Sequence, residues 1–240
     1  AALIPSHGSI VGLTGAGVSA ESGLQTFRGA GGLWEGHRLE DVATPEAFAR
    51  DPATVQRFYN LRRAQLRDPK IAPNAAHRAL AELEARWRGR VTLVTQNVDD
   101  LHERAGHREV WHMHGALDRA YCLACGGETP WRDDLDTASR CPACGAVGRL
   151  RPAVVWFGEF PRYMDEIEQA LVDADLFVAI GTSGVVYPAA GFVQEARALG
   201  RAHTVEINLE PSSTRSLFHE ARHGPASELV PAWVDELLGR

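Results

Sequence analysis

Short runs of apolar and β-branched residues recur along the 240-residue chain and alternate with helical patterns. Runs that are apolar at nearly every position are typical of strands buried on both faces of a parallel sheet. The predicted strands are residues 9–14, 91–95, 109–113, 153–157, 176–180 and 203–207. The predicted helices are residues 77–87, 164–172, 189–199 and 231–238. This alternation predicts an α/β fold built on a Rossmann-like, doubly wound parallel sheet.

Two stretches interrupt the alternation. Residues 36–75 have helical patterns with no strand between them, and residues 118–150 carry all four cysteines with little periodicity. We expect both to form a smaller lobe inserted into the sheet domain: a helical module at 36–75 and a four-cysteine module at 118–150. The Rossmann-like domain then comprises residues 1–35, 76–117 and 151–240.

The composition is that of an ordinary globular protein, with 45% hydrophobic and 23% charged residues. The net charge of −6 and the absence of a lysine-rich block argue against a nucleic-acid partner. No run of 18 apolar residues and no signal-peptide pattern is present, so we expect no membrane partner. The four cysteines are too few and too clustered for a secreted disulfide scaffold, so we expect a cytoplasmic protein.

The first predicted strand runs into Gly15-Ala16-Gly17-Val18-Ser19-Ala20, a Gly-x-Gly-x-x-Ala pattern. In dinucleotide-binding folds the first glycine permits a tight turn and the second lets the backbone approach a pyrophosphate. The helix that follows offers free N–H groups to phosphate. The pattern predicts a dinucleotide site, although glycine-rich turns also occur without a ligand.

A dehydrogenase with this turn has a second strand that ends in an acidic residue about 20 residues further on. The corresponding window reads RGAGGLWEGHRLED, with four glycines and no strand pattern. We expect this loop to fold over the ligand, with Phe27, Arg28 and Trp34 as contacts. A ribose contact could come instead from Asn208 or Glu210, after the last predicted strand. The sequence therefore disfavours hydride transfer.

The cysteines form two CxxC pairs, Cys122 with Cys125 and Cys141 with Cys144, separated by 15 residues. This spacing is typical of a four-cysteine zinc site, and the alternatives are two disulfides or buried thiols. Four thiolates complete a tetrahedron and leave no position for water, so one structural zinc ion is expected. His114 is then available for other chemistry.

Polar residues follow the strand predicted at 91–95, namely Gln96, Asn97, Asp99 and Asp100. Asn97 or Asp99 could simply cap a helix that begins near Asp100. The group nevertheless holds more amides and carboxylates than one cap needs, at the edge where the dinucleotide is expected. A second strand-to-Gly-Thr-Ser pattern at residues 181–186 can donate further hydrogen bonds to phosphate or ribose.

Together these segments resemble the sirtuins, the NAD-dependent protein-lysine deacylases. GAGVSAESGLQTFRG, TQNVDD, HMHG, the CxxC pairs, RPAVVWFGE, GTSGVVYPAA and INLE occur in the family's order over essentially the whole chain. The resemblance implies that NAD is consumed as a co-substrate and that the partners are acyl-lysine proteins or peptides. It also implies that His114 is the catalytic base and that Asn97 and Asp99 position the nicotinamide, the ribose and water.

The resemblance extends to the binding residues. The implied NAD site consists of Gly15, Ala16, Gly17, Ser19, Phe27, Arg28, Trp34, Gln96, Asn97, Val98, Asp99, Gly181, Thr182, Ser183, Asn208, Leu209, Glu210 and Ala226. The implied substrate site consists of Ala43, Tyr59, Arg62, Val155, Trp156, Phe157, Gly158, Glu159 and Val185. Residues 154–159 are expected to pair with an extended peptide. The implied products are free lysine, nicotinamide and O-acyl-ADP-ribose.

Tyr59 and Arg62 lie at i and i+3 of a predicted helix. Without the resemblance, Arg62 reads as a solvated residue and Tyr59 as partly core. The Tyr-x-x-Arg spacing and the small Ala43 resemble the sirtuin branch that prefers negatively charged acyl groups, here called class III. We therefore expect a desuccinylase or demalonylase with some deacetylase activity, and a monomer. Rival hypotheses are a protein mono-ADP-ribosyltransferase and a non-catalytic, NAD-sensing peptide-binding module.

Overall fold

The structure, a computed structural model, describes residues 4–24, 33–34, 37–199 and 201–240. Its main element is a six-stranded sheet in which all neighbouring strands are parallel. In spatial order the strands are β11 (Glu220–His223), β10 (His203–Asn208), β9 (Leu176–Ile180), β1 (Ile10–Thr14), β4 (Val91–Thr95) and β5 (Val110–His112). The strand order reverses between β9 and β1, as in doubly wound folds. The predicted fold class is confirmed.

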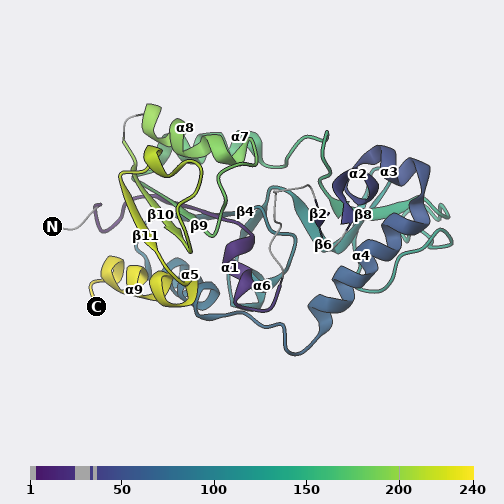
Figure 1. The fold of residues 1–240 in the computed structure, drawn as a ribbon, viewed down its shortest axis with the longest axis horizontal. Helices are drawn as coiled ribbons and strands as arrows, with labels where there is room; N and C mark the ends of the chain where they lie inside the picture. Colours follow the sequence, from purple (N-terminus) through teal and green to yellow (C-terminus); the bar gives the residue numbers. More distant parts are fainter. Residues whose placement is uncertain (1–3, 25–32, 35–36, 200) are drawn as a thin grey trace.

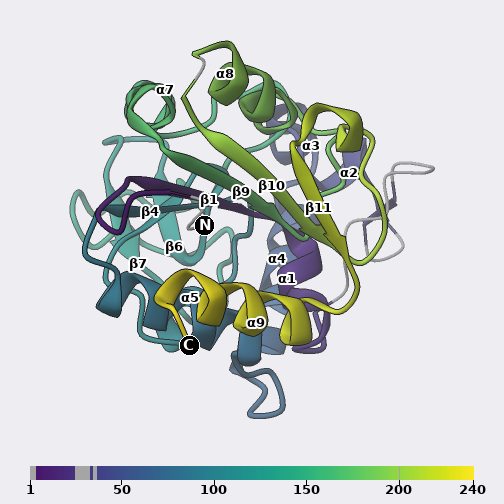
Figure 2. The ribbon, with the colours of Figure 1, turned by 90° about the vertical axis from the view of Figure 1, so that its left-hand side faces the viewer.

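Helices cover both faces of this sheet (Figure 2). One face carries α7 (Met164–Asp173) and α8 (Phe192–Ala198), the latter preceded by the 3₁₀ turn η1 (Ala189–Gly191). The other face carries α5 (Ala75–Arg86) and α9 (Ala226–Leu238). The short helices α1 (Ala16–Ala20) and α6 (Leu101–Arg104) follow β1 and β4, and a second 3₁₀ turn, η2 (Arg215–Leu217), precedes β11.

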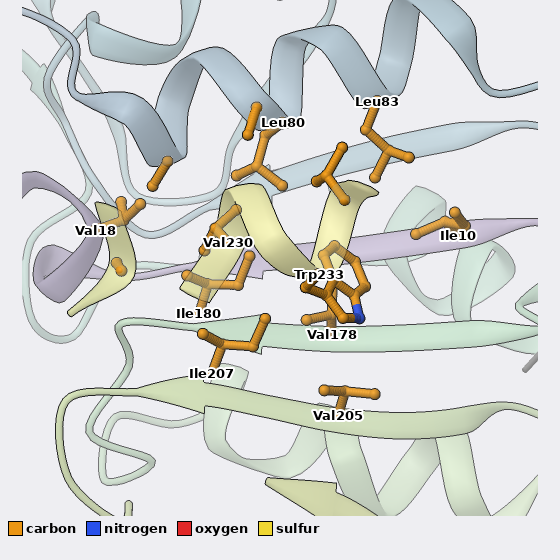
Figure 3. Close-up of a cluster of buried hydrophobic side chains, with 14 of the residues drawn as sticks. Ile10, Val18, Leu80, Leu83, Val178, Ile180, Val205, Ile207, Val230 and Trp233 are labelled. Carbon is orange, nitrogen blue, oxygen red and sulfur yellow. The ribbon is translucent and has the colours of Figure 1, made fainter. Parts of the chain in front are cut away.

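The core consists of a hydrophobic cluster on each face of the sheet. Trp233 of α9 is fully buried and packs with Val178 and Val205 in the cluster beneath α5 and α9 (Figure 3). Neighbouring side chains of one strand point to opposite faces of the sheet: Ile10 belongs to this cluster, and Val11 belongs to the cluster beneath α7 and α8. Because both faces are covered, the strands are apolar at nearly every position.

The smaller lobe combines helices with a three-stranded antiparallel sheet (Figure 1). Its helices are α2 (Leu39–Val42), α3 (Pro45–Arg50) and α4 (Pro52–Arg67), and its sheet has the order β7 (Glu128–Pro130), β6 (Gly115–Cys122), β8 (Leu150–Val154). The side chains that cap α3 and α4 accept hydrogen bonds from the first helical turn, and each cap is followed by proline at the first helical position. A two-stranded pairing joins β2 (Leu33–Trp34) to β3 (His37–Arg38).

Several predicted elements differ from the structure. The strand predicted at 153–157 is wrong: β8 ends at Val154 and belongs to the antiparallel sheet. The helix predicted from residue 231 begins at Ala226, with Pro231 inside it. Strand β11 was not predicted, because its sequence, EARH, is polar. Residues 36–75 also contain β3, and β6 and β7 extend into the segment 118–150. The domain boundaries stay a prediction, and no described helix is long and apolar enough to cross a membrane.

Candidate active site

A cavity of about 960 Å³ opens between the sheet domain and the smaller lobe. Loops that follow the carboxyl ends of β1, β4, β9 and β10 line it, and so do residues of α4 and the segment after β8 in the smaller lobe. The cavity therefore includes the point where the strand order reverses, which is the place where doubly wound folds bind their ligands.

Glycines bring the loops after β1 and β9 into close contact. A Cβ atom on Gly17 would lie 2.7 Å from the Cα atom of Gly181, and one on Gly15 would lie 2.7 Å from the Gly181 carbonyl oxygen. The Gly17 N–H donates to that same carbonyl oxygen (2.8 Å). Gly15 has an extended backbone with φ −126°, so it is required here by close packing and not by a left-handed turn. The two glycines thus hold two cavity loops together, in addition to any contact with a ligand.

Side-chain amides tie the other loops to this pair. Gln96 Nε2 donates to Thr182 Oγ1 (3.1 Å), and Asn208 Nδ2 donates to the Thr182 carbonyl oxygen (2.9 Å). Asn97 Nδ2 donates to the Gly15 carbonyl oxygen (3.1 Å). Four loops from different strands are therefore fixed against one another before any ligand arrives, which favours a preorganised site.

His114 lies between β5 and β6 and lines the cavity. Its Nδ1 is 3.1 Å from the Gln96 carbonyl oxygen, which can only accept, so Nδ1 carries the proton. Burial lowers the pKa of His114, and the hydrogen bond to Gln96 opposes this only in part. A neutral imidazole with an unprotonated Nε2 results, which is the form that a general base requires.

Asp99 is 7% exposed and lines the same cavity. Burial raises the pKa of this carboxyl group to about 6, against hydrogen bonds that favour the charged form. These bonds come from Ser19 Oγ (3.0 Å) and from the Leu101 N–H (3.1 Å). The N-cap residue of α6 is Asp100, so Asp99 is not the predicted cap, although its carboxylate accepts one hydrogen bond at the start of this helix.

The part of the cavity formed by the smaller lobe is largely apolar and contains one guanidinium group. Tyr59 is fully buried, and its hydroxyl accepts a hydrogen bond from Trp156 Nε1 (2.8 Å). One turn further along α4, the Arg62 guanidinium lies over the Phe58 ring, 4.5 Å from its centre. Ala43 is buried and also lines the cavity, where its small side chain leaves room. Tyr59 belongs to a core cluster of this lobe as well as to the cavity wall, and Arg62 is half-buried and not a solvated residue.

The segment after β8 is a turn. Glu159 accepts two hydrogen bonds from the Arg151 guanidinium (2.6 and 2.9 Å) and one from the Trp156 N–H (2.8 Å). Arg151 stacks on the Trp156 ring at 3.5 Å. The Phe157 N–H donates to the Ala43 carbonyl oxygen (3.0 Å), so this edge of the segment is already paired. Residues 155–159 are therefore held in place by the protein itself.

The structure brings most of the predicted site residues together. Those that line the cavity are Gly15, Ala16, Gly17, Ser19, Ala43, Tyr59, Arg62, Gln96, Asn97, Val98, Asp99, His114, Val155, Trp156, Phe157, Gly158, Glu159, Gly181, Thr182, Ser183, Asn208, Leu209, Glu210 and Ala226. Val185 is exposed and is not among the lining residues, whereas Val186 and Tyr187 are. Phe27, Arg28 and the side chain of Trp34 lie outside the described part of the chain.

Other lining residues were not predicted. They are Ala20, Glu21, Leu24, Leu39, Gln65, Leu66, Leu117, Pro161, Val186, Tyr187, Pro211, Ser212 and Pro225. Most are apolar or neighbours of a predicted residue. An apolar cavity wall has the same sequence signal as a core, so only adjacency to a motif could have identified them.

The four cysteines converge at one end of the smaller lobe. Their sulfur atoms all lie within 4.8 Å of one another, with Cys122 to Cys144 at 3.8 Å and Cys125 to Cys141 at 3.9 Å. Four thiolates about 2.3 Å from a central zinc ion have sulfur atoms about 3.8 Å apart, so the cluster fits a tetrahedral zinc. In both CxxC pairs the first cysteine accepts a backbone hydrogen bond from the residue four positions later (2.9 Å). The predicted four-cysteine zinc site is confirmed, and disulfides are not formed.

Comparisons with known proteins agree with this site. The sequence profile of the Sir2 family matches residues 15–188. An NAD-dependent protein deacylase of Bdellovibrio bacteriovorus is 58% identical over 230 residues, which cover 96% of this chain and 97% of that protein. One from Salmonella typhimurium is 60% identical over 226 residues, covering 94% and 82%.

Solved structures show the same architecture. A Sir2 homologue in complex with NAD aligns with a TM-score of 0.85 at 39% identity, covering 95% of this chain and 89% of that one. A complex of Sir2 with a p53 peptide and NAD⁺ aligns with a TM-score of 0.78 at 28% identity, covering 95% and 92%. The resemblance predicted from the motifs is thereby confirmed, and the chain belongs to the Sir2 family.

Proposed function

We propose that this chain is an NAD-dependent protein-lysine deacylase. The supporting observation is that one cavity combines the loops after β1 and β9, which pack together at their glycines, with the imidazole of His114 and the guanidinium of Arg62. A dinucleotide, a base and an acyl group can therefore meet in one place. The deacylases of Bdellovibrio and Salmonella, at 58% and 60% identity, support the same activity.

In this proposal NAD and the acyl-lysine are both substrates. The acyl carbonyl oxygen attacks C1′ of the nicotinamide ribose, and the bond to nicotinamide breaks. His114 then removes the proton of a ribose hydroxyl through its Nε2, and this hydroxyl attacks the former carbonyl carbon. Asn97 and Asp99 position the ribose, the nicotinamide and water. The bond from that carbon to the lysine nitrogen then breaks, and a water molecule adds to the carbon in place of the amine and supplies the proton that the amine takes up. The products are nicotinamide, free lysine and O-acyl-ADP-ribose.

The binding roles of the remaining predicted residues belong to the same proposal. The loops at residues 15–19, 96–99, 181–183 and 208–210, together with Ala226, hold NAD. Phe27, Arg28 and Trp34 are proposed to contact it from the segment that follows. Ala43, Tyr59 and Arg62 form the acyl channel, and residues 155–159 with Val185 contact the peptide. The solved complex with a p53 peptide supports an acyl-lysine peptide as substrate.

We further propose that succinyl and malonyl groups are preferred over acetyl. A guanidinium in an otherwise apolar channel can bind a terminal carboxylate through two parallel hydrogen bonds. An acetyl group has no carboxylate with which to form these bonds. We also propose a cytoplasmic location, because the four cysteines form a thiolate cluster and not disulfides.

An acyl-peptide panel tests the function. The zinc-loaded protein is incubated with NAD and one peptide that carries acetyl-, malonyl-, succinyl- or glutaryl-lysine, and nicotinamide and ADP-ribose products are identified by mass spectrometry. We expect O-acyl-ADP-ribose from the wild type and a loss of at least about 100-fold in His114→Ala. ADP-ribose attached to protein, with no O-acyl-ADP-ribose, would indicate mono-ADP-ribosyl transfer. Release of no nicotinamide would indicate a binding module.

A further inference from the structure

A second cavity, of about 600 Å³, shares the residue Asp99 with the NAD cavity. It is polar, and it lies where α6, the end of β5, the start of β6 and the segment before α7 meet. His112 and Glu103 both line it, and neither has a role in the proposed reaction. Asp99 thus borders both cavities, and the second one is lined by titratable groups.

His112 is the last residue of β5 and is held by two acceptors. Its Nδ1 lies 2.9 Å from the Asn97 carbonyl oxygen, and its Nε2 lies 2.6 Å from Glu103 Oε1. Neither a carbonyl oxygen nor a carboxylate can donate, so both ring nitrogens carry protons and the ring is an imidazolium. The side chain of His112 is only 12% exposed, so this charge is largely shielded from water.

The charge of His112 follows from its partners. Burial opposes the imidazolium, but the hydrogen bond and charge of Glu103 and the Asn97 carbonyl outweigh it, so the pKa of His112 is raised. Burial also opposes the charged form of Glu103, yet the hydrogen bond and charge of His112 lower the pKa of Glu103. Both pKa directions favour the ionised pair, in agreement with the two acceptors beside the His112 ring.

His112 and His114 hold consecutive carbonyl groups of one segment. His114 Nδ1 donates to Gln96 and His112 Nδ1 donates to Asn97. His114 has a lowered pKa and His112 has a raised one, because Glu103 faces the His112 ring and not the His114 ring. One histidine of the HMHG motif is thus neutral at the NAD cavity, and the other is charged at the second cavity.

Other charged groups surround the pair. The charge of His112 favours the ionised form of Asp99, whereas the neighbouring Asp100 opposes it. The buried His102 of α6 has a pKa well below its usual value, because of burial and the neighbouring histidines, and so is neutral. The further titratable and charged groups lining the second cavity are Asp100, Arg104, Asp118, Arg119, Glu128, Arg132, Arg162 and Tyr163. Their ion pairs join Arg104 to Asp100, Arg119 and Arg162 to Glu128, and Arg132 to Asp118.

We propose that His112 and Glu103 form a positioning pair, a shielded imidazolium that holds the backbone at Asn97 and keeps Asp99 ionised at neutral pH. The inference deepens the proposed function and rests on it, because Asp99 positions the ribose, the nicotinamide and water in that reaction. The pKa of Asp99 is about 6 because burial raises it while two hydrogen bonds and the charge of His112 lower it, so loss of the His112 charge should raise it further, toward neutral pH. His112 and Glu103 act through Asp99 and Asn97 and do not touch the substrates.

The test compares pH profiles. Values of kcat/KM for deacylation are measured from pH 5.5 to 9 for the wild type, His112→Gln, Glu103→Gln and Glu84→Gln. Glu84 is the control, since it also pairs with a buried histidine, His107 (3.7 Å), whose charge acts on Glu103 without a hydrogen bond to it. We expect the acidic limb of the profile to move upward by about one pH unit in His112→Gln, the lower end of the shift that a neighbouring opposite charge causes.

The second variant isolates charge from shape. Glu103→Gln keeps the side-chain volume and an acceptor for His112. We expect the acidic limb to shift upward by less than in His112→Gln, because the His112 ring, neutral in this variant at higher pH, is protonated again at low pH. The control should keep the wild-type limb. A loss of activity that is equal at every pH, or an unmoved limb in both variants, would overturn the inference and indicate a merely structural role.

A second measurement separates this inference from the proposed function. The Asp99 carboxyl carbon is titrated by NMR in ¹³C-aspartate-labelled protein, with Asp99→Asn identifying the signal. We expect its midpoint to rise in His112→Gln and in Glu103→Gln, whether or not the wild type deacylates peptides. An unchanged midpoint in folded variants refutes the inference. If the midpoint rises in the variants but the wild type does not deacylate peptides, only the proposed function is refuted.

Discussion

Replacement of Arg62 by methionine tests the proposed acyl preference. Arg62 lies on α4 with its guanidinium 4.5 Å from the centre of the Phe58 ring, and it lines the cavity beside Tyr59 and Ala43. Methionine keeps an unbranched apolar side chain that can still contact Phe58. The substitution therefore removes the charge and its hydrogen bonds while most of the packing stays.

The expected loss follows from the bonds at stake. A hydrogen bond between charged groups contributes about 1.5–3 kcal/mol, and a guanidinium can make two to one carboxylate. A loss of about 3 kcal/mol corresponds to a drop of about 100-fold in kcat/KM for a succinyl-lysine peptide. An acetyl group makes neither bond, so we expect its kcat/KM to change by less than about threefold.

The assay measures kcat/KM with succinyl-, malonyl- and acetyl-lysine in one peptide sequence at saturating NAD. Arg57→Met is the matched control, because Arg57 lies on the same helix but is exposed and donates a local hydrogen bond to Thr54 (2.7 Å). It should leave all three values unchanged. Equal losses on succinyl and acetyl substrates in Arg62→Met would refute the argument, since they would show that Arg62 supports the fold or NAD binding and not the acyl group.

Three further outcomes follow from the structure. Gly17→Ala places a Cβ atom 2.7 Å from the Gly181 backbone, so we expect the free energy of unfolding to fall by about 1–3 kcal/mol, measured by urea unfolding, and NAD to bind more weakly, measured by calorimetry. Unchanged values would contradict the close packing. Cys125→Ser, or a strong chelator, should remove the zinc and make residues 118–150 sensitive to protease, while zinc content that stays at one per chain would argue against the four-thiolate site. For Asp99, the raised pKa of about 6 means that the native state binds more protons than the unfolded state between about pH 4 and 6, so stability falls as the pH rises through this window. Asp99→Asn should therefore be more stable than the wild type at pH 7.5, by up to about 3 kcal/mol, yet less active. The difference in unfolding free energy between Asp99→Asn and the wild type should narrow at pH 5. If denaturant unfolding gives the same difference at both pH values, the argument that Asp99 is a buried charge is refuted.

The elements that the sequence predicts well are those whose burial is uniform. Five of the six predicted strands lie in the parallel sheet, because β1, β4, β5, β9 and β10 are covered by helices and are largely apolar. The CxxC pairs predict their own convergence, since zinc coordination restricts the ligand spacing. These are local signals, and they need no knowledge of the neighbours in space.

Other elements depend on contacts between distant residues. Strand β11 is polar and forms only because β10 offers an unpaired edge, and the residues after β8 form a turn because Arg151 and Glu159 hold them. Tyr59 could be read as core or as a site residue, and only the position of α4 against the cavity shows that it is both buried and part of the lining.

The sequence by itself determined the alternation of strands and helices, the metal-binding cysteines and the identity of the polar residues at the strand ends. Only the tertiary structure decided which charge each of those residues carries. His112 and His114 are two positions apart and chemically identical, yet Glu103 faces the ring of His112 and favours its charge. Burial lowers the pKa of His114, which has no such carboxylate beside it among the described residues. Protonation depends on the distance to partners and on access to water, and both are set when separate segments pack together.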